Sequence, residues 1–138
     1  MKKCSFCDIT KGKISSLKVY ETDHILIFAP LKETIMGKGH IIIIPKKHYE
    51  NFYDINEREL SEIVKTIKRI SIKLKDKLNA DGLNILHASG KSGQQSVFHF
   101  HIHIIPRYKN DGLDTWPKTG YKEKDYSGHY NLLKKILN

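Results

Sequence analysis

One stretch limits the fold of this chain more than any other, because in residues 95–106 histidines alternate with large apolar side chains. Alternation with a period of two predicts a β-strand, on which successive side chains point to opposite faces. One face then carries three imidazoles, those of His99, His101 and His103. The other face carries four apolar residues, Phe98, Phe100, Ile102 and Ile104. Neighbouring imidazoles on such a strand lie roughly 6.6 to 6.8 Å apart, so one ring can react while the next orients it.

Three histidines in register indicate a function. A single histidine on the polar face of an exposed strand carries no information, but with 8 histidines among 138 residues chance rarely spaces three in this way. Neutral imidazole is nucleophilic near pH 7 without prior deprotonation, so it can approach an anionic phosphate. We therefore interpret the strand as the centre of a site for phosphoryl chemistry.

The histidine pattern, with Gln95-Ser96 before it and Pro106-Arg107 after it, resembles the signature of the histidine triad (HIT) family of nucleotide hydrolases and transferases. The resemblance extends from Cys4 to about Trp116. It implies an α+β fold with an antiparallel sheet of about five strands, one long helix, a short N-terminal helix or turn and a C-terminal helix. It also implies a homodimer in which two such sheets join.

The same resemblance implies a role for each residue of the signature. His101 is expected to be the nucleophile, forming a covalent nucleotidyl intermediate that water then hydrolyses. His103 is expected to hydrogen-bond the phosphoryl oxygens or to orient His101, and Ser96 to protonate or position the leaving group. Gln95 is expected to offer its amide to the phosphate. The alternative for Ser96 and Gln95 is that they are ordinary polar residues at a strand entrance.

The substrate implied is a nucleoside phosphoramidate or a dinucleoside polyphosphate, with the nucleotide in an apolar slot. By resemblance Phe6, Ile9 and Phe28 line this slot, although all three could equally belong to the core, and His40 sits beside the triad as a supporting residue.

Three positions depart from the family pattern. An acidic residue that accepts the ribose hydroxyls is usual at the position of Pro30, an asparagine at Ala88 and a glycine at Gln94. These departures leave ribose and phosphate recognition, and hence the substrate, open.

A C-x-x-C pair, Cys4 and Cys7, opens the chain. On its own this pair is a weak signal, since a structural zinc site needs two more ligands. Resemblance to the bacterial-type branch of the family adds His48 and His99 and so implies a structural Zn²⁺. Two spare buried thiols are one alternative. A catalytic zinc held by all three triad histidines is another, but ligands spaced along one strand must then converge on one ion, and the cysteines are left unexplained.

The remaining patterns describe a single domain over residues 1–138, with a core in 1–106 and a loop and helix in 107–138. Strands are expected at 19–21, 24–28, 40–44 and 83–87, because short apolar or alternating runs there end at turn residues. Apolar residues at helical spacing predict one long helix over 56–78 and a short amphipathic one over about 127–137. We expect His87, at the end of its strand, to lie outside the site.

The net charge says less about the binding partners than the histidine pattern does. The formal net charge of +9 favours polyanions, whether small phosphorylated metabolites or nucleic acids. No long basic tail is present, so nucleic acid is an unlikely partner that the net charge still allows. A zinc-stabilised nucleotide- or RNA-binding module without turnover is therefore the alternative function. The longest aliphatic run, residues 41–44, cannot span a bilayer, and no secretory signal is visible, so we expect a soluble cytoplasmic protein.

Overall fold

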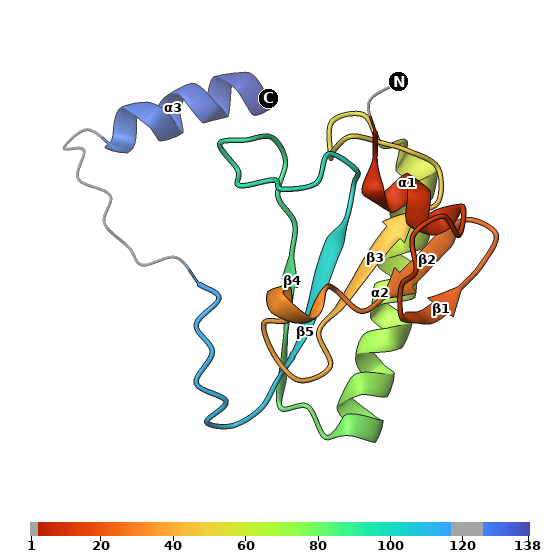
Figure 1. The fold of residues 1–138 in the computed structure, drawn as a ribbon. Helices are drawn as coiled ribbons and strands as arrows, with labels where there is room; N and C mark the ends of the chain where they lie inside the picture. Colours follow the sequence, from red (N-terminus) through yellow and green to blue (C-terminus); the bar gives the residue numbers. More distant parts are fainter. Residues whose placement is uncertain (1–2, 117–125) are drawn as a thin grey trace.

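The computed structural model describes residues 3–116 and 126–138. Its centre is a five-stranded antiparallel sheet with the strand order β1-β2-β3-β5-β4 (Figure 1). The strands are β1 (Lys18–Glu21), β2 (Ile25–Phe28), β3 (Ile41–Pro45), β4 (Gly82–Leu86) and β5 (Ile102–Arg107). The helices are α1 (Ser5–Thr10), α2 (Glu57–Leu78), α3 (Tyr126–Leu137) and a short 3-10 helix, η1 (Lys32–Thr34). The α+β fold predicted from the sequence is confirmed.

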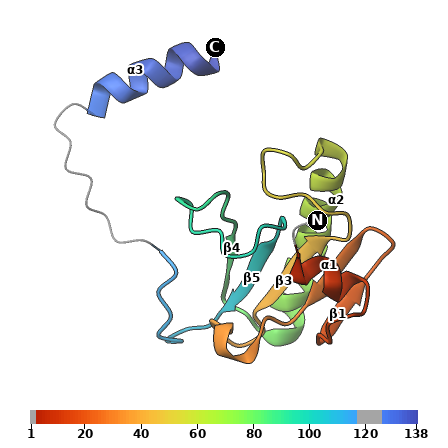
Figure 2. The ribbon, with the colours of Figure 1, turned by 45° about the horizontal axis from the view of Figure 1, so that its top comes forward.

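Helices cover the sheet on both faces, with α2 on one side and α1 on the other (Figure 2). Strand β3 shows why this arrangement suits the sequence. Ile41 and Ile43 pack into the cluster beneath α2, while Ile42 and Ile44 pack into the cluster beneath α1. A strand buried on both faces needs a continuous apolar run rather than an alternating one, which accounts for four successive isoleucines.

Helix α2 follows the predicted apolar stripe. It begins at Glu57, because the Asn56 side chain accepts a hydrogen bond of 2.9 Å from the Glu59 backbone N–H. Ile63 and Ile67 lie in the core, as predicted, but Val64, an apolar residue at the edge of the predicted stripe, is 54% exposed. The helix ends at Asn79, which adopts the left-handed conformation.

The histidine-bearing strand is shorter than predicted. β5 begins at Ile102, and the segment that carries His99 and His101 is irregular. β4 ends at Leu86, so its ladder with β5 stops at the pair Leu86–His103. The ladder with β3 stops at the pair Ile43–Ile102, although β3 itself continues to Pro45 beside β2. Among the described residues, the segment before Ile102 pairs with no strand on either side.

The predicted alternation of side chains between two faces is correct only for the residues in or next to β5. Phe100, Ile102 and Ile104 all enter the core cluster beneath α2. Phe98 was expected on that same face and this prediction is wrong, because Phe98 is 37% exposed at the surface. His103 lies opposite Ile42 in the ladder, which puts it on the α1 face. The α1 face is therefore the one that carries the imidazole chemistry.

Within residues 3–116 and 126–138, no helix is both long and apolar enough to cross a membrane. The C-terminal helix lies where it was predicted and exposes several apolar side chains, Leu132, Leu133, Ile136 and Leu137.

Candidate functional site

The imidazole of His101 is held by its own main chain. Its Nδ1 lies 2.7 Å from the carbonyl oxygen of His99. A carbonyl oxygen can only accept, so Nδ1 carries the proton and Nε2 carries a lone pair. Burial lowers the pKa of His101 more than this hydrogen bond raises it, and nearby His87 lowers it further. His101 is thus a neutral imidazole at pH 7 with a lone pair on Nε2, in a side chain that is 4% exposed.

A second chain of hydrogen bonds gives His103 the opposite tautomer. The backbone N–H of Met36 donates to Nδ1 of His40 over 3.1 Å, so Nε2 of His40 carries the proton. That Nε2–H donates over 2.9 Å to Nδ1 of His103, which leaves the Nε2 of His103 protonated. Burial lowers the pKa of His103 to about 4 and also lowers the pKa of His40, so both rings are neutral.

The two triad rings therefore offer complementary groups. The centroids of His101 and His103 are 5.1 Å apart, and the rings meet edge to face. One presents a lone pair and the other a hydrogen-bond donor. Phe6 on α1 packs edge-on against His101, with centroids 5.3 Å apart, and keeps that side of the ring apolar. A nucleophile beside a donor is the arrangement that displacement at a phosphorus atom requires.

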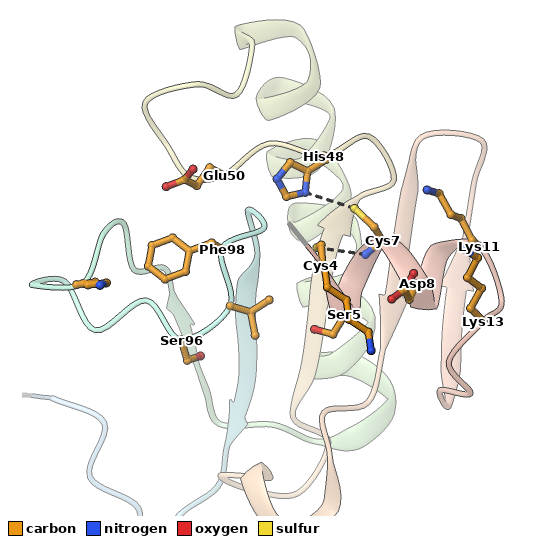
Figure 3. Close-up of a pocket in the computed structure, with 13 residues that line it drawn as sticks. Cys4, Ser5, Cys7, Asp8, Lys11, Lys13, His48, Glu50, Ser96 and Phe98 are labelled. Carbon is orange, nitrogen blue, oxygen red and sulfur yellow. Dashed lines mark hydrogen bonds between the residues drawn. The ribbon is translucent and has the colours of Figure 1, made fainter. Parts of the chain in front are cut away.

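A second cluster lies next to this pair and brings together Cys4, Cys7, His48 and His99, whose ligand atoms all fall within 4.8 Å of one another. Nδ1 of His99 is 3.4 Å from the Sγ of Cys4, 3.5 Å from the Sγ of Cys7 and 3.3 Å from the Nδ1 of His48. Figure 3 shows Cys7 on α1 facing the imidazole of His48, which follows β3, across 3.3 Å.

The donor set and its geometry fit a tetrahedral zinc ion. Nε2 of His99 donates to the carbonyl oxygen of Pro45 over 2.9 Å, so the Nδ1 lone pair faces the two thiols. Ordinary Zn–S and Zn–N bonds at tetrahedral angles put ligand atoms about 3.3 to 3.7 Å apart. Four ligand-atom pairs of the cluster lie at 3.3 to 3.5 Å, within this range. The four residues could therefore hold a metal ion.

Other interpretations of the cluster fit less well. Burial and the neighbouring Cys4 raise the pKa of Cys7 to about 11, which is the opposite of what a reactive redox thiol needs. Of the three triad histidines only His99 belongs to the cluster, since the Nδ1 atoms of His101 and His103 are both engaged elsewhere. Among residues 3–116 and 126–138, the three triad histidines do not come together as one set of metal ligands.

The family follows from comparison with known proteins. The family model described as the HIT domain matches residues 11–110. This range covers well over half of the chain.

The chain belongs to the HIT family.

Relatives of this HIT chain have been found in several organisms. The protein hit of Bacillus subtilis is 40% identical over 138 residues, covering 97% of this chain and 94% of that protein. A Saccharomyces cerevisiae protein named adenosine 5'-monophosphoramidase is 35% identical, covering 97% of this chain and 80% of that one. A crystal structure of a zinc-bound histidine triad family protein from Mycobacterium smegmatis superposes with a TM-score of 0.76 at 29% identity, covering 98% and 93% of the two chains.

The remaining predicted residues of the HIT signature lie before β5. Ser96 is exposed and lines a cavity of about 1150 Å³, together with Phe98 and, across from them, residues of α1 (Figure 3). Gln95 is buried, and both of its amide hydrogens are used, one by the carbonyl of Glu50 at 2.6 Å and one by that of Val97 at 3.1 Å. In this state the Gln95 amide holds the loop together and has no hydrogen left for a phosphate.

Phe6, Ile9 and Phe28, the residues expected to line the nucleotide slot, are brought together in the buried cluster beneath α1. The ring of Phe6 meets that of Phe28 edge to face, with centroids 5.4 Å apart. All three side chains are buried and pack as part of the core, and Phe6 also contacts the ring of His101.

Two positions carry information that the sequence alone did not yield. Gln94 has φ = 67°, so this chain keeps the left-handed backbone at the place where a glycine is usual in the HIT signature. His87, expected outside the site, donates to the carbonyl oxygen of His101 over 2.8 Å. A histidine directly after the strand that pairs with the triad strand was the available signal.

Proposed function

We propose that this HIT protein is a nucleotide hydrolase or nucleotidyl transferase that works through a covalent nucleotidyl intermediate on His101. One observation carries the proposal. The ring of His101, with a lone pair on Nε2, lies next to the ring of His103, with a proton on Nε2; their centroids are 5.1 Å apart, and burial keeps both rings neutral. A binding module without turnover has no need for opposite tautomers on adjacent rings.

The reaction runs as two displacements at the α-phosphorus. In the first, Nε2 of His101 forms a bond to phosphorus, the bond to the leaving group breaks, and the leaving group takes the electron pair and a proton from the Ser96 hydroxyl or solvent, which the water of the second step replaces. In the second, a water oxygen attacks the same phosphorus, the P–N bond breaks, and the electron pair returns to Nε2 as the water loses a proton. The Nε2–H of His103 stabilises the phosphoryl oxygens in both steps.

Other residues bind and position the nucleotide in this proposal. Ser96, exposed at the cavity, protonates or positions the leaving group. Gln95 reaches the phosphate only if one of its two carbonyl contacts is released, so its first role is to hold the loop. Phe6, Ile9 and Phe28 give the apolar surface for the nucleoside, and His40 sets the tautomer of His103.

A nucleoside phosphoramidate is the substrate class with the best support. The yeast relative is named an adenosine 5'-monophosphoramidase and aligns with 97% of this chain. Dinucleoside polyphosphates offer the same α-phosphorus with a different leaving group, and so they belong in the same assay.

The test of function is turnover of an adenosine 5'-phosphoramidate and of a dinucleoside polyphosphate, with intact-protein mass spectrometry for a nucleotidyl adduct. His101→Ala is expected to lower kcat by at least about 10³-fold and to abolish the adduct, because no other ring offers a free lone pair there. His24→Ala, at an exposed histidine beside a turn, is the matched control and should behave as wild type. Activity that survives His101→Ala removes the mechanism. Tight, salt-sensitive oligonucleotide binding without turnover indicates the binding module instead.

We further propose that the cluster of Cys4, Cys7, His48 and His99 holds a structural zinc ion. The support is the tetrahedral spacing of its ligand atoms and the zinc-bound Mycobacterium smegmatis relative. The ion would tie α1 to the segment before β5 and hold His99 where its carbonyl orients His101. The proposal places the protein in the cytoplasm, where a reducing environment keeps both cysteines as thiols.

Metal analysis of the purified protein is expected to give one zinc per chain. Cys4→Ser and Cys7→Ser should lower zinc content and reduce Tm by about 5 °C or more, since a structural ion contributes to folding. Ser5→Ala, at the exposed position between them, should change neither. Turnover should fall less than tenfold while the variants stay folded. Zinc retained in the double cysteine variant contradicts this assignment.

A homodimer is the proposed assembly, formed through the free edge of β4. β4 ends the sheet on that side, and Ile85 on it is 51% exposed. An edge strand with unpaired backbone groups and an exposed isoleucine is a site where a second copy can extend the sheet. Sedimentation should therefore give a dimer at micromolar concentration and a shift toward monomer for Ile85→Lys. A wild-type monomer at that concentration contradicts the dimer.

A further inference from the structure

His87 follows the last residue of β4 and uses both of its ring nitrogens. Nδ1 lies 2.8 Å from the carbonyl oxygen of His101, so Nδ1 carries the proton and donates. Nε2 lies 2.7 Å from the hydroxyl of Ser89 and accepts from it. The hydroxyl oxygen of Ser89 in turn accepts from the backbone N–H of Phe52 at 3.1 Å. In this series of hydrogen bonds every donor meets an acceptor, and the series ends at the main-chain carbonyl oxygen of His101.

Packing fixes the plane of the His87 ring. The ring stacks on Phe100 with centroids 4.7 Å apart and an interplanar angle of 30°. Phe52 lies near the same ring with centroids 5.7 Å apart. Phe100 is fully buried, so this surface does not move. The direction of the Nδ1–H bond is therefore set by the core and not by solvent.

The carbonyl oxygen that accepts from His87 belongs to His101, which lies outside the strand pairs of the sheet. The last ladder pairs before it involve Ile102 with Ile43 and His103 with Leu86, so no strand residue pairs with His101. The segment before β5 is held by other means: Phe100 N–H donates to the carbonyl of Tyr49 at 2.6 Å, and Nδ1 of His101 donates to the carbonyl of His99. The His87 hydrogen bond replaces a missing ladder contact at the residue that bears the nucleophile.

We propose that His87 is a positioning residue for the reaction, acting through the peptide of His101 to keep Nε2 of His101 aimed at phosphorus. The inference rests on the proposed function of His101. His87 does not act as an acid or base on the substrate, because both of its ring nitrogens are already engaged. Loss of its hydrogen bond frees the carbonyl, and displacement of a nucleophile by about 1 Å costs up to about 10²-fold in rate.

The test compares His87→Asn with His87→Leu on adenosine 5'-phosphoramidate. Asparagine places an amide N–H near the position of Nδ1, whereas leucine fills the space between Phe52 and Phe100 without a donor. His87→Leu is expected to lower kcat by about 10- to 100-fold with KM changed less than about threefold. His87→Asn should restore kcat to within about fivefold of wild type. Such rescue by the donor variant is not expected from a residue that only fills space.

Ser89→Ala gives a second variant that leaves the His87 ring in place. It removes the hydroxyl that donates to Nε2, so the ring is less firmly held, and kcat should fall by about 3- to 10-fold. If His87→Leu fails to fold, the kcat of Ser89→Ala tests the role of His87 instead. Unchanged kcat in His87→Leu, or in Ser89→Ala when leucine does not fold, overturns the role of His87 and leaves the proposed function intact. Absence of turnover in wild type overturns both.

Discussion

Hydrogen bonds from imidazole rings to main-chain carbonyls determine how this site works. Nε2 of His99 donates to Pro45, Nδ1 of His101 to His99, and Nδ1 of His87 to His101. Each bond fixes which nitrogen keeps the proton, and so which nitrogen faces the metal cluster, the substrate or the supporting serine. His99 belongs to both sites, because its side chain lies among the cysteines and its carbonyl orients the nucleophile.

Much of the fold could be predicted, because it depends on periodic patterns. The stripe of α2, the four isoleucines of β3 and the hairpin of β1 and β2 were all where their spacing indicated. The start of β5 could not be predicted, because alternation in residues 95–101 continues past the point where the ladders with β3 and β4 stop. Phe98 was misplaced for the same reason. The single domain over 1–138 stays a prediction, and part of its C-terminal segment lies outside the described residues.

The candidate site, like the fold, could be predicted from the sequence only in part. Residue types and spacing pointed to the triad, and resemblance to the HIT family pointed to the cluster of two cysteines and two histidines, whose ligand atoms lie together in space. The tautomers and the engaged amide of Gln95 depend on contacts between distant segments and leave no local pattern, and the position of His87 at a strand end was only a weak signal. The loop before the triad adds a further case: the left-handed Gln94 sits where the amide oxygen of Gln95 accepts from the N–H of Gly90 at 2.8 Å, which closes the loop without the usual glycine.

Nitrogen-15 NMR of histidine-labelled protein tests the opposite tautomers of the triad most directly. At pH 6.5, where an ordinary imidazole is about half protonated, both rings should be more than half neutral because burial lowers the pKa of each. The account predicts a protonated Nδ1 and a bare Nε2 for His101, with the reverse for His103. Spectra in which His101 is protonated at Nε2, or in which both rings share one tautomer, contradict it.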